Sequence, residues 1–236
     1  MNFLFDLYGT LADIWTDEEK KTLWCGFAEL LGESDYELVK AEYHAICKRY
    51  SDAREHKFVE FDLLLVFEEM LRSRGIEKDK APEFARQFRL LSRERLQLFP
   101  CIVEILEGLK ERGAGVYLVS NAQSCFTRDE LDELGIARLF DGILISSEAG
   151  VKKPDVGIFH VAFEKFGIEG QKNYYVGNDL HDDVLGASRA GLSTVYIETQ
   201  QSGRYPDLAV APDYTVSTHY EMMTQLFELA EGKNND

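Results

Sequence analysis

Short apolar segments alternate with longer stretches of helical periodicity along most of the chain. Runs rich in β-forming residues occupy 3–5, 116–119, 143–145, 174–176 and 194–197, with a weaker run at 214–216. Between most of them, apolar residues recur at helical spacing over about 102–112, 127–134, 156–166 and 184–190, and again after 218. Strand–helix alternation is typical of a parallel sheet covered by helices on both faces, so the pattern predicts an α/β fold.

Helix-start signals refine this reading. Pro100 precedes the helical pattern that ends before Gly113, as expected of a proline at the start of a helix. Capping boxes, in which Ser or Thr is followed three residues later by Glu, predict four further helix starts. They are Thr16 with Glu19, Ser34 with Glu37, Thr127 with Glu130, and Thr218 with Glu221.

The stretch from Trp15 to Leu98 differs from the rest because it shows no strand pattern. Its apolar residues fall at helical spacing, which predicts an all-helical block of about 80 residues directly after the first strand and its loop. A bundle inserted there would lie over the carboxyl end of the first strand. In open α/β sheets that edge is where ligands bind.

Four polar motifs follow predicted strands or precede predicted helices. Each has an ordinary structural explanation when taken alone, because acids and hydroxyls commonly cap loops and helix starts. Together and in this order they favour one shared site. The motifs are Asp6 before the turn at Gly9, Ser120 with Asn121, Lys153 before Pro154, and the group Asn178, Asp179, Asp182 and Asp183.

These motifs resemble the haloacid dehalogenase-like (HAD) hydrolase superfamily, and the helical insert resembles the cap of its first structural class. The resemblance implies that Asp6 is a nucleophile that forms a covalent aspartyl intermediate. It implies that Ser120 hydrogen-bonds the transferring group with Asn121 nearby, and that Lys153 keeps Asp6 ionised. Thr10 and Asp183 complete the implied catalytic set.

The same resemblance implies a Mg²⁺ cofactor, which prefers oxygen ligands. The expected ligands are Asp6, the backbone carbonyl of Tyr8, and Asn178 or Asp179. Asn178 stands where the superfamily pattern has its metal-binding aspartate, and Asp179 stands in the place of a serine. Whether Asn178 or Asp179 binds the metal is left open by the sequence.

Tyr8 occupies the position at which the phosphatases carry a second aspartate as general acid and base. A phenol of pKa near 10 is a poor proton shuttle at neutral pH. The segment Phe-Asp-Leu-Tyr-Gly-Thr resembles that of the 2-haloacid dehalogenases, whose halide leaving group needs no protonation. Those enzymes, however, carry a tyrosine six residues after the motif lysine, where this chain has Phe159, and an arginine in the early cap, where it has Lys40.

The acidic fourth motif favours a cation, which dehalogenation does not need. The sequence is therefore interpreted as a Mg²⁺-dependent hydrolase of a small phosphomonoester. A 2-haloacid dehalogenase is the alternative, and a non-catalytic protein that binds a phosphorylated ligand is the third reading. We expect a Rossmann-like core over 1–13 and 99–236 and a helical cap over 14–98, with Trp15, Lys40 and Tyr43 as candidate substrate contacts.

The charge and the cysteine content indicate which kinds of partner and which compartment to expect. The 236 residues include 26 Lys and Arg against 42 Asp and Glu, a formal net charge of −16. Such a chain repels nucleic acids and anionic membranes, so we expect a small-molecule substrate and neither of those partners. Four widely spaced cysteines and the lack of a basic leader favour a cytoplasmic protein with reduced thiols. A monomer and a homodimer are both compatible with the sequence.

Overall fold

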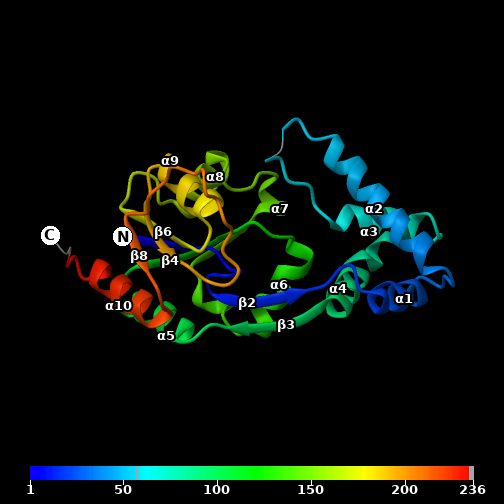
Figure 1. The fold of residues 1–236 in the computed structure, drawn as a ribbon, viewed down its shortest axis with the longest axis horizontal. Coiled ribbons are helices and arrows are strands. Elements are labelled where there is room, and N and C mark those ends of the chain that lie inside the picture. Colours follow the sequence, from blue (N-terminus) through cyan, green and yellow to red (C-terminus); the bar gives the residue numbers. More distant parts are fainter. Residues whose placement is uncertain (57, 234–236) are drawn as a thin grey trace.

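Six apolar segments form one parallel sheet in the computed structural model of the protein, which describes residues 1–56 and 58–233 (Figure 1). The strands lie in the order β5-β4-β1-β6-β7-β8. Their bounds are β1 Asn2–Phe5, β4 Gly115–Ser120, β5 Gly142–Ile145, β6 Asn173–Gly177, β7 Ser193–Ile197 and β8 Tyr214–Val216. Every neighbouring pair is parallel, so the predicted α/β fold is confirmed.

Helices cover both faces of this sheet because alternate side chains of each strand point to opposite sides. Phe3 and Phe5 belong to one apolar cluster, and Leu4 between them belongs to the other. The first face is covered by α5 (Ile102–Glu111), α6 (Ser124–Glu133) and α10 (His219–Ala230). The second is covered by α8 (Val156–Phe166) and α9 (Gly186–Arg189).

Short helical turns complete the sheet-bearing part of the molecule. They are η2 (Ala137–Leu139), α7 (Ser146–Ala149) and the π-helical turn η3 (Leu180–Leu185). In the part of the chain that is described, no helix has the length and apolarity that crossing a membrane requires.

The strand order places a topological switch at β1. The chain runs outward from β1 through β4 to β5, and then returns to the other side of β1 through β6 and β7 to β8. The three adjacent strands β4, β1 and β6 therefore end together at one edge of the sheet. Ligands of open α/β sheets bind at such a point.

Four helices form a separate body beside the sheet, here called the helical lobe (residues 21–92; Figure 1). They are α1 (Lys21–Leu30), α2 (Tyr36–Asp52), α3 (Leu64–Arg72) and α4 (Ala81–Ser92), with the short turn η1 (Lys78–Lys80). The lobe is built around a second apolar cluster, which contains several buried aromatic rings and includes Phe126 of α6. The predicted division into a cap over 14–98 and a core stays a prediction.

The expectation that 15–98 contains no strand is wrong. Strand β3 (Arg93–Leu98) pairs antiparallel with β2 (Ala12–Thr16), and this ribbon joins the helical lobe to the sheet (Figure 1). The sequence of β3, Arg-Glu-Arg-Leu-Gln-Leu, is largely charged and only partly buried. Hydrophobic pattern therefore did not mark it, and its pairing with β2 decides its conformation.

The capping boxes had mixed outcomes. The box at Thr218 is confirmed, because its hydroxyl accepts from the backbone N–H of Glu221. The box at Ser34 marks the start of α2 to within one residue, but the capping side chain is that of Asp35. The other two are wrong, because α1 begins at Lys21 and α6 begins at Ser124, three residues before Thr127. Thr127 and its partner Glu130 are instead buried inside the structure, with consequences described below.

We predict that Phe88→Ala destabilises the protein by about 3–5 kcal/mol, the usual cost of truncating a buried Phe. Phe88 is fully buried, and its ring contacts those of Trp24, Phe27, Tyr43 and Phe67. Urea unfolding followed by circular dichroism measures the change. The control Leu38→Ala removes a side chain that is 69% exposed and should change the free energy of unfolding by less than about 0.5 kcal/mol. Equal losses in the two variants would contradict this packing.

Candidate active site

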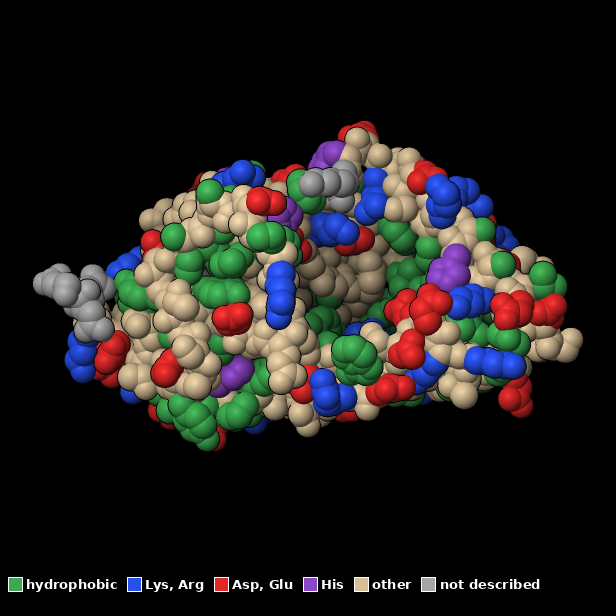
Figure 2. Space-filling view, in the orientation of Figure 1, with side chains coloured by type: hydrophobic (Ala, Val, Ile, Leu, Met, Phe, Trp, Pro, Cys, Tyr) green, Lys and Arg blue, Asp and Glu red, His purple; other side chains and the backbone are tan. Residues whose placement is uncertain are grey.

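The ends of β4, β1 and β6 meet at a cavity of about 170 Å³. Its walls include the carboxylates of Asp6, Asp179, Asp182 and Asp183 and the ammonium group of Lys153. The space-filling view shows a hollow between the sheet-bearing part of the molecule and the helical lobe (Figure 2). All four sequence motifs, which are up to 177 residues apart in the chain, thus contribute residues to one cavity, the second through Asn121.

Asp6 follows the last residue of β1 and extends the sheet, since its N–H donates to the carbonyl of Val176 at 2.9 Å. Its Oδ1 accepts from Ser120 Oγ at 3.2 Å and from Lys153 Nζ at 2.7 Å. Among the described residues, no side chain or backbone group hydrogen-bonds Asp6 Oδ2. One oxygen of the carboxylate is therefore fixed, and the other is available to an electrophile in the cavity.

The chain leaves Asp6 through a turn that needs glycine. Gly9 has a φ of +86°, which favours glycine, and a Cβ there would lie 2.5 Å from Asn178 Nδ2. This close approach brings the first and fourth motifs into contact.

Lys153 is 2% exposed and makes three contacts of 2.7 Å through Nζ, to Asp6 Oδ1, Asp183 Oδ1 and Tyr175 Oη. Burial by itself lowers the pKa of Lys153, but the carboxylates of Asp183 and Asp6 outweigh it and hold the pKa well above its usual value. Burial raises the pKa of Asp183, and Lys153 opposes that change. The lysine is thus a fixed cation between two carboxyl groups.

Asn121 positions the loop that carries this lysine. Its Oδ1 accepts from the Lys153 N–H at 2.8 Å, and its Nδ2 donates to the Lys153 carbonyl at 3.0 Å. The same amide nitrogen donates to Asp182 Oδ2 at 3.1 Å. Asn121 therefore connects the second, third and fourth motifs.

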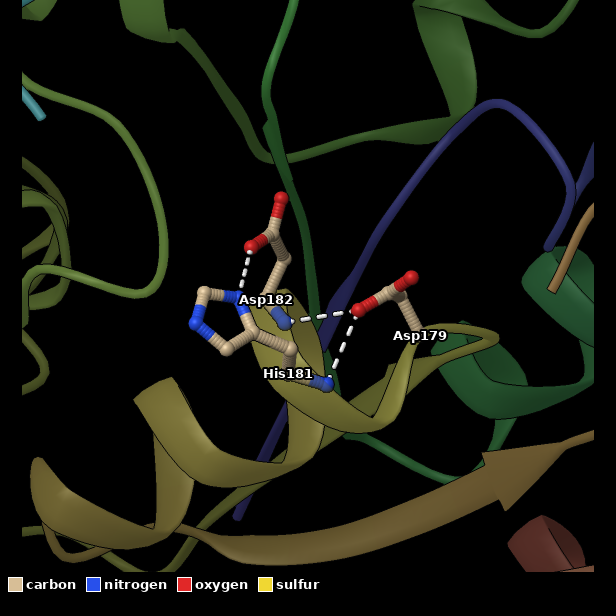
Figure 3. A group of neighbouring side chains, drawn as sticks. All are labelled: Asp179, His181 and Asp182. Atoms are coloured by element: carbon tan, nitrogen blue, oxygen red, sulfur yellow. Dashed lines mark hydrogen bonds and ion pairs between the residues drawn. The ribbon is translucent and has the colours of Figure 1, made fainter. Parts of the chain in front are cut away.

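The fourth motif presents its acids through the start of η3. Asp179 caps this turn, because its Oδ1 accepts from the backbone N–H groups of His181 and Asp182 at 2.9 and 2.8 Å (Figure 3). His181 Nδ1 lies 2.7 Å from Asp182 Oδ1. One potential ligand atom from each of these three residues lies within 4.8 Å of the other two.

The oxygen donors suit a hard cation such as Mg²⁺. Asn178 Oδ1 accepts one hydrogen bond from Thr10 Oγ1 at 3.1 Å, and Asp179 Oδ2 accepts one from Tyr205 Oη at 2.7 Å. Each of these oxygens keeps a lone pair for a metal ion. The residues present thus fit the cofactor that the resemblance implies, with Asp6, Asn178 and Asp179 all lining the cavity.

Tyr8 also lines the cavity, but its hydroxyl is directed to α6. The phenol donates to Glu130 Oε2, and Thr127 Oγ1 lies 3.0 Å from the phenol oxygen. Burial and the Glu130 carboxylate raise the pKa of Tyr8 above its ordinary value. Glu130 is 1% exposed and is held by Arg89 Nε of α4 at 2.7 Å. Tyr8 is therefore part of a buried polar network.

The remaining residues that the sequence suggested for the site lie in different parts of the molecule. Thr10 is fully buried and holds Asn178, with no hydrogen bond to Asp6 among the described residues. Tyr43 is buried inside the helical lobe, where it stacks on Phe88, so it is not free to contact a substrate. Lys40 pairs with Glu19. Trp15 is 57% exposed on β2.

Several site residues were missed by the sequence reasoning. Tyr175 of β6 accepts from Lys153 and donates to the carbonyl of Val119 at 2.7 Å. Tyr205 and Gln201 reach the site from the loop 198–213, and Gln201 Nε2 donates to Asp13 Oδ1 at 2.7 Å. Tyr175 reads as an ordinary strand residue, and the loop carries no motif, so no sequence signal marked them.

Comparison with known proteins gives a match to the family model described as haloacid dehalogenase-like hydrolase over residues 1–191. The phosphoserine phosphatase of Thermus thermophilus is 31% identical over 190 residues, which are 80% of this chain and 74% of that protein. The glyceraldehyde 3-phosphate phosphatase of Methanopyrus kandleri is 32% identical over 141 residues, which are 58% of this chain and 59% of that protein.

Solved structures agree on the fold. The 2-haloacid dehalogenase from Pseudomonas syringae pv. Tomato DC3000 has a TM-score of 0.63 at 23% identity, covering 97% of this chain and 96% of that one. The magnesium-bound HAD-hydrolase YfnB from Bacillus subtilis has a TM-score of 0.58 at 20% identity, covering 95% and 97%. At these identities the similarity concerns the fold alone.

We predict that Lys153→Met, measured in chelator, destabilises the protein by about 3–5 kcal/mol because two buried carboxyl groups lose their counterion. The neighbouring Lys152→Met is the matched control. It removes a partly exposed pair with Glu60 at 3.2 Å and should cost less than about 1 kcal/mol. Denaturant titration of both variants measures the difference, and a smaller loss for Lys153→Met than for Lys152→Met would refute the assignment.

Proposed function

The chain belongs to the haloacid dehalogenase-like hydrolases, and we propose that it hydrolyses a small phosphomonoester with Mg²⁺ through a covalent intermediate on Asp6. As a member of this family, the protein is a hydrolase. The choice of phosphate is supported by the relatives named above, which are phosphatases of small metabolites. The metal and the residue roles are supported by the charges and contacts of the cavity.

The observation that carries the proposal is the charge of the cavity walls. Among the described residues that line it, four carboxylates face one ammonium group. A phosphate dianion would be repelled from such a cavity unless a divalent cation accompanied it. Mg²⁺, when bound, would supply that neutralisation, and Asp6, the Tyr8 carbonyl, Asn178 and Asp179 would hold it.

The chain's own groups then have distinct tasks. Asp6 Oδ2 attacks the phosphorus, while Lys153 and Ser120 hold Oδ1 and so fix the direction of attack. Lys153 also stabilises negative charge on the transferring group. Asn121, Thr10 and Asp183 act on these groups by holding Lys153 and Asn178 in place.

The helical lobe would act as a cap that selects the substrate and excludes water. The hollow beside the lobe supports a route of entry (Figure 2). The lobe also contacts the sheet-bearing part directly, for example where the Glu60 N–H donates to the carbonyl of Gly150 at 2.9 Å. We place the cap at 14–98 and its hinge in the β2–β3 ribbon.

A 2-haloacid dehalogenase remains the second candidate because Tyr8 matches its first motif. Phe159 counts against it. This side chain is fully buried with its ring 5.3 Å from that of Tyr175, and it offers no hydroxyl at the position where dehalogenases carry tyrosine. The acidic cavity also repels a haloacid carboxylate.

We predict that Asp6→Asn lowers phosphate release by at least about 10³-fold, since the nucleophile is removed while the hydrogen bond to Ser120 can persist. A panel of phosphomonoesters with Mg²⁺, repeated in chelator, provides the assay, and circular dichroism checks the fold. Asp132→Asn, an exposed site on α6, is the control and should retain activity. Halide release from a 2-haloacid in chelator, without phosphate release in Mg²⁺, would favour the dehalogenase instead.

We further predict that Asp179→Ser weakens Mg²⁺ binding about tenfold or more, measured by calorimetry without substrate. Serine can still cap η3, so the melting temperature in chelator should change little. Asp182→Asn is the comparison, and a larger loss of Mg²⁺ affinity in that variant would move the ligand from Asp179 to Asp182.

A further inference from the structure

We propose that this hydrolase expels its leaving group without protonating it, so that its substrates carry phosphate on a weakly basic oxygen, as in acyl, enol or aryl phosphates. The inference rests on the proposed function and specifies the substrate class of the same site. It follows from how the hydrogen-bonding groups around Asp6 are already engaged.

The phenol of Tyr8 is the first group to consider, because it stands next to Asp6 in the same loop. Its hydrogen is donated to Glu130 Oε2, on the side of α6. Glu130 is 1% exposed and also pairs with Arg89 Nε at 2.7 Å, so its oxygens face two hydrogen-bond donors. The hydrogen of Tyr8 is therefore committed to a buried carboxylate and is not directed at a departing oxygen.

The carboxylates that line the cavity are also acceptors. Asp179 accepts from the N–H groups of His181 and Asp182 and from the Tyr205 hydroxyl. Asp182 accepts from Asn121 Nδ2. Asp183 accepts from Lys153 and from the Asp179 N–H. The oxygens in these contacts face N–H and O–H donors, so they are not placed to give a hydrogen to a departing oxygen.

The nitrogen groups offer no acid either. The three N–H bonds of Lys153 match its three oxygen partners, and the amides of Asn121, Asn178 and Gln201 are not proton donors to a leaving oxygen at neutral pH. His181 is the remaining candidate. It is not among the described residues that line the cavity, and its ring stacks on that of Tyr205 at 5.6 Å.

The two steps then balance as follows. Asp6 Oδ2 forms a bond to phosphorus, the bond from phosphorus to the leaving oxygen breaks, and that oxygen departs as an anion with the electron pair. Water next attacks the phosphorus of the aspartyl phosphate, and the bond to Asp6 breaks. This step regenerates the carboxylate and releases phosphate and one proton, which the solvent transfers to the expelled anion.

The experiment is a leaving-group series with the full chain and Mg²⁺. Values of kcat/KM for substituted phenyl phosphates and for alkyl phosphates are plotted against the pKa of the leaving alcohol, because kcat/KM includes bond cleavage whichever step limits turnover. We expect a steep decline, with alkyl phosphates about 10²–10⁴-fold slower than acidic phenyl phosphates, the usual contribution of a general acid. A flat plot with rapid alkyl phosphate hydrolysis overturns the proposal.

Two variants test the remaining donors. Tyr8→Phe keeps the ring and removes the hydroxyl, so the slope of the plot should stay the same whatever happens to absolute rates. His181→Gln should likewise leave the slope unchanged. A steeper slope in either variant would identify that residue as the acid and refute the proposal. If Tyr8→Phe does not fold, the slope of the natural protein still decides.

The outcomes separate this inference from the function on which it rests. If no phosphorylated compound of either kind releases phosphate, the proposed function fails. If phosphate is released but the slope is shallow, the function stands and only the inference on the leaving group fails.

Discussion

The buried ammonium group of Lys153 is the interaction on which the rest of the site depends. It lies 2.7 Å from carboxylate oxygens of both Asp6, which follows β1, and Asp183, which lies within η3. Two carboxyl groups so deeply buried would repel one another without this cation. The edge formed by β4, β1 and β6 can therefore concentrate acids only because the loop before α8 delivers a lysine into it, with Asn121 holding that loop.

Tyr8 bears both on the chemistry of the site and on how the helical lobe is attached. The residue that departs from the phosphatase pattern, Tyr8, is also the one that connects the nucleophile loop to Glu130. Glu130 in turn binds Arg89 of α4, in the helical lobe, and lies 3.5 Å from Arg93 of β3, in the ribbon that joins the lobe to the sheet. An aspartate at position eight would be too short to take the place of this phenol, so the departure has a structural consequence as well as a chemical one.

The loop 198–213 makes a comparable connection on the other side of the site. Tyr205 orients Asp179, and Gln201 joins the cavity to Asp13 of β2. The acids of the fourth motif are thus held both by their own helical turn and by a distant loop. This arrangement fixes their geometry without a carboxylate at position 178, where an asparagine held by Thr10 supplies only a neutral oxygen.

The sequence by itself determined the six strands of the parallel sheet, helices α5, α8 and α10, the order of the four motifs and their meeting at one edge, because apolar periodicity and strand-end polar residues are local signals. It did not reveal the ribbon of β2 and β3, in which the charged residues of β3 are ordered by pairing with β2. Nor did it reveal the burial of Thr127 and Glu130, which the sequence presented as a capping box. Only the tertiary structure decided these features and the hydrogen-bond partners of Tyr8 and Asp179. Each depends on a group that is distant in the chain and is brought close by packing. Glu130 lies 122 residues from Tyr8, and Tyr205 lies 26 residues from Asp179.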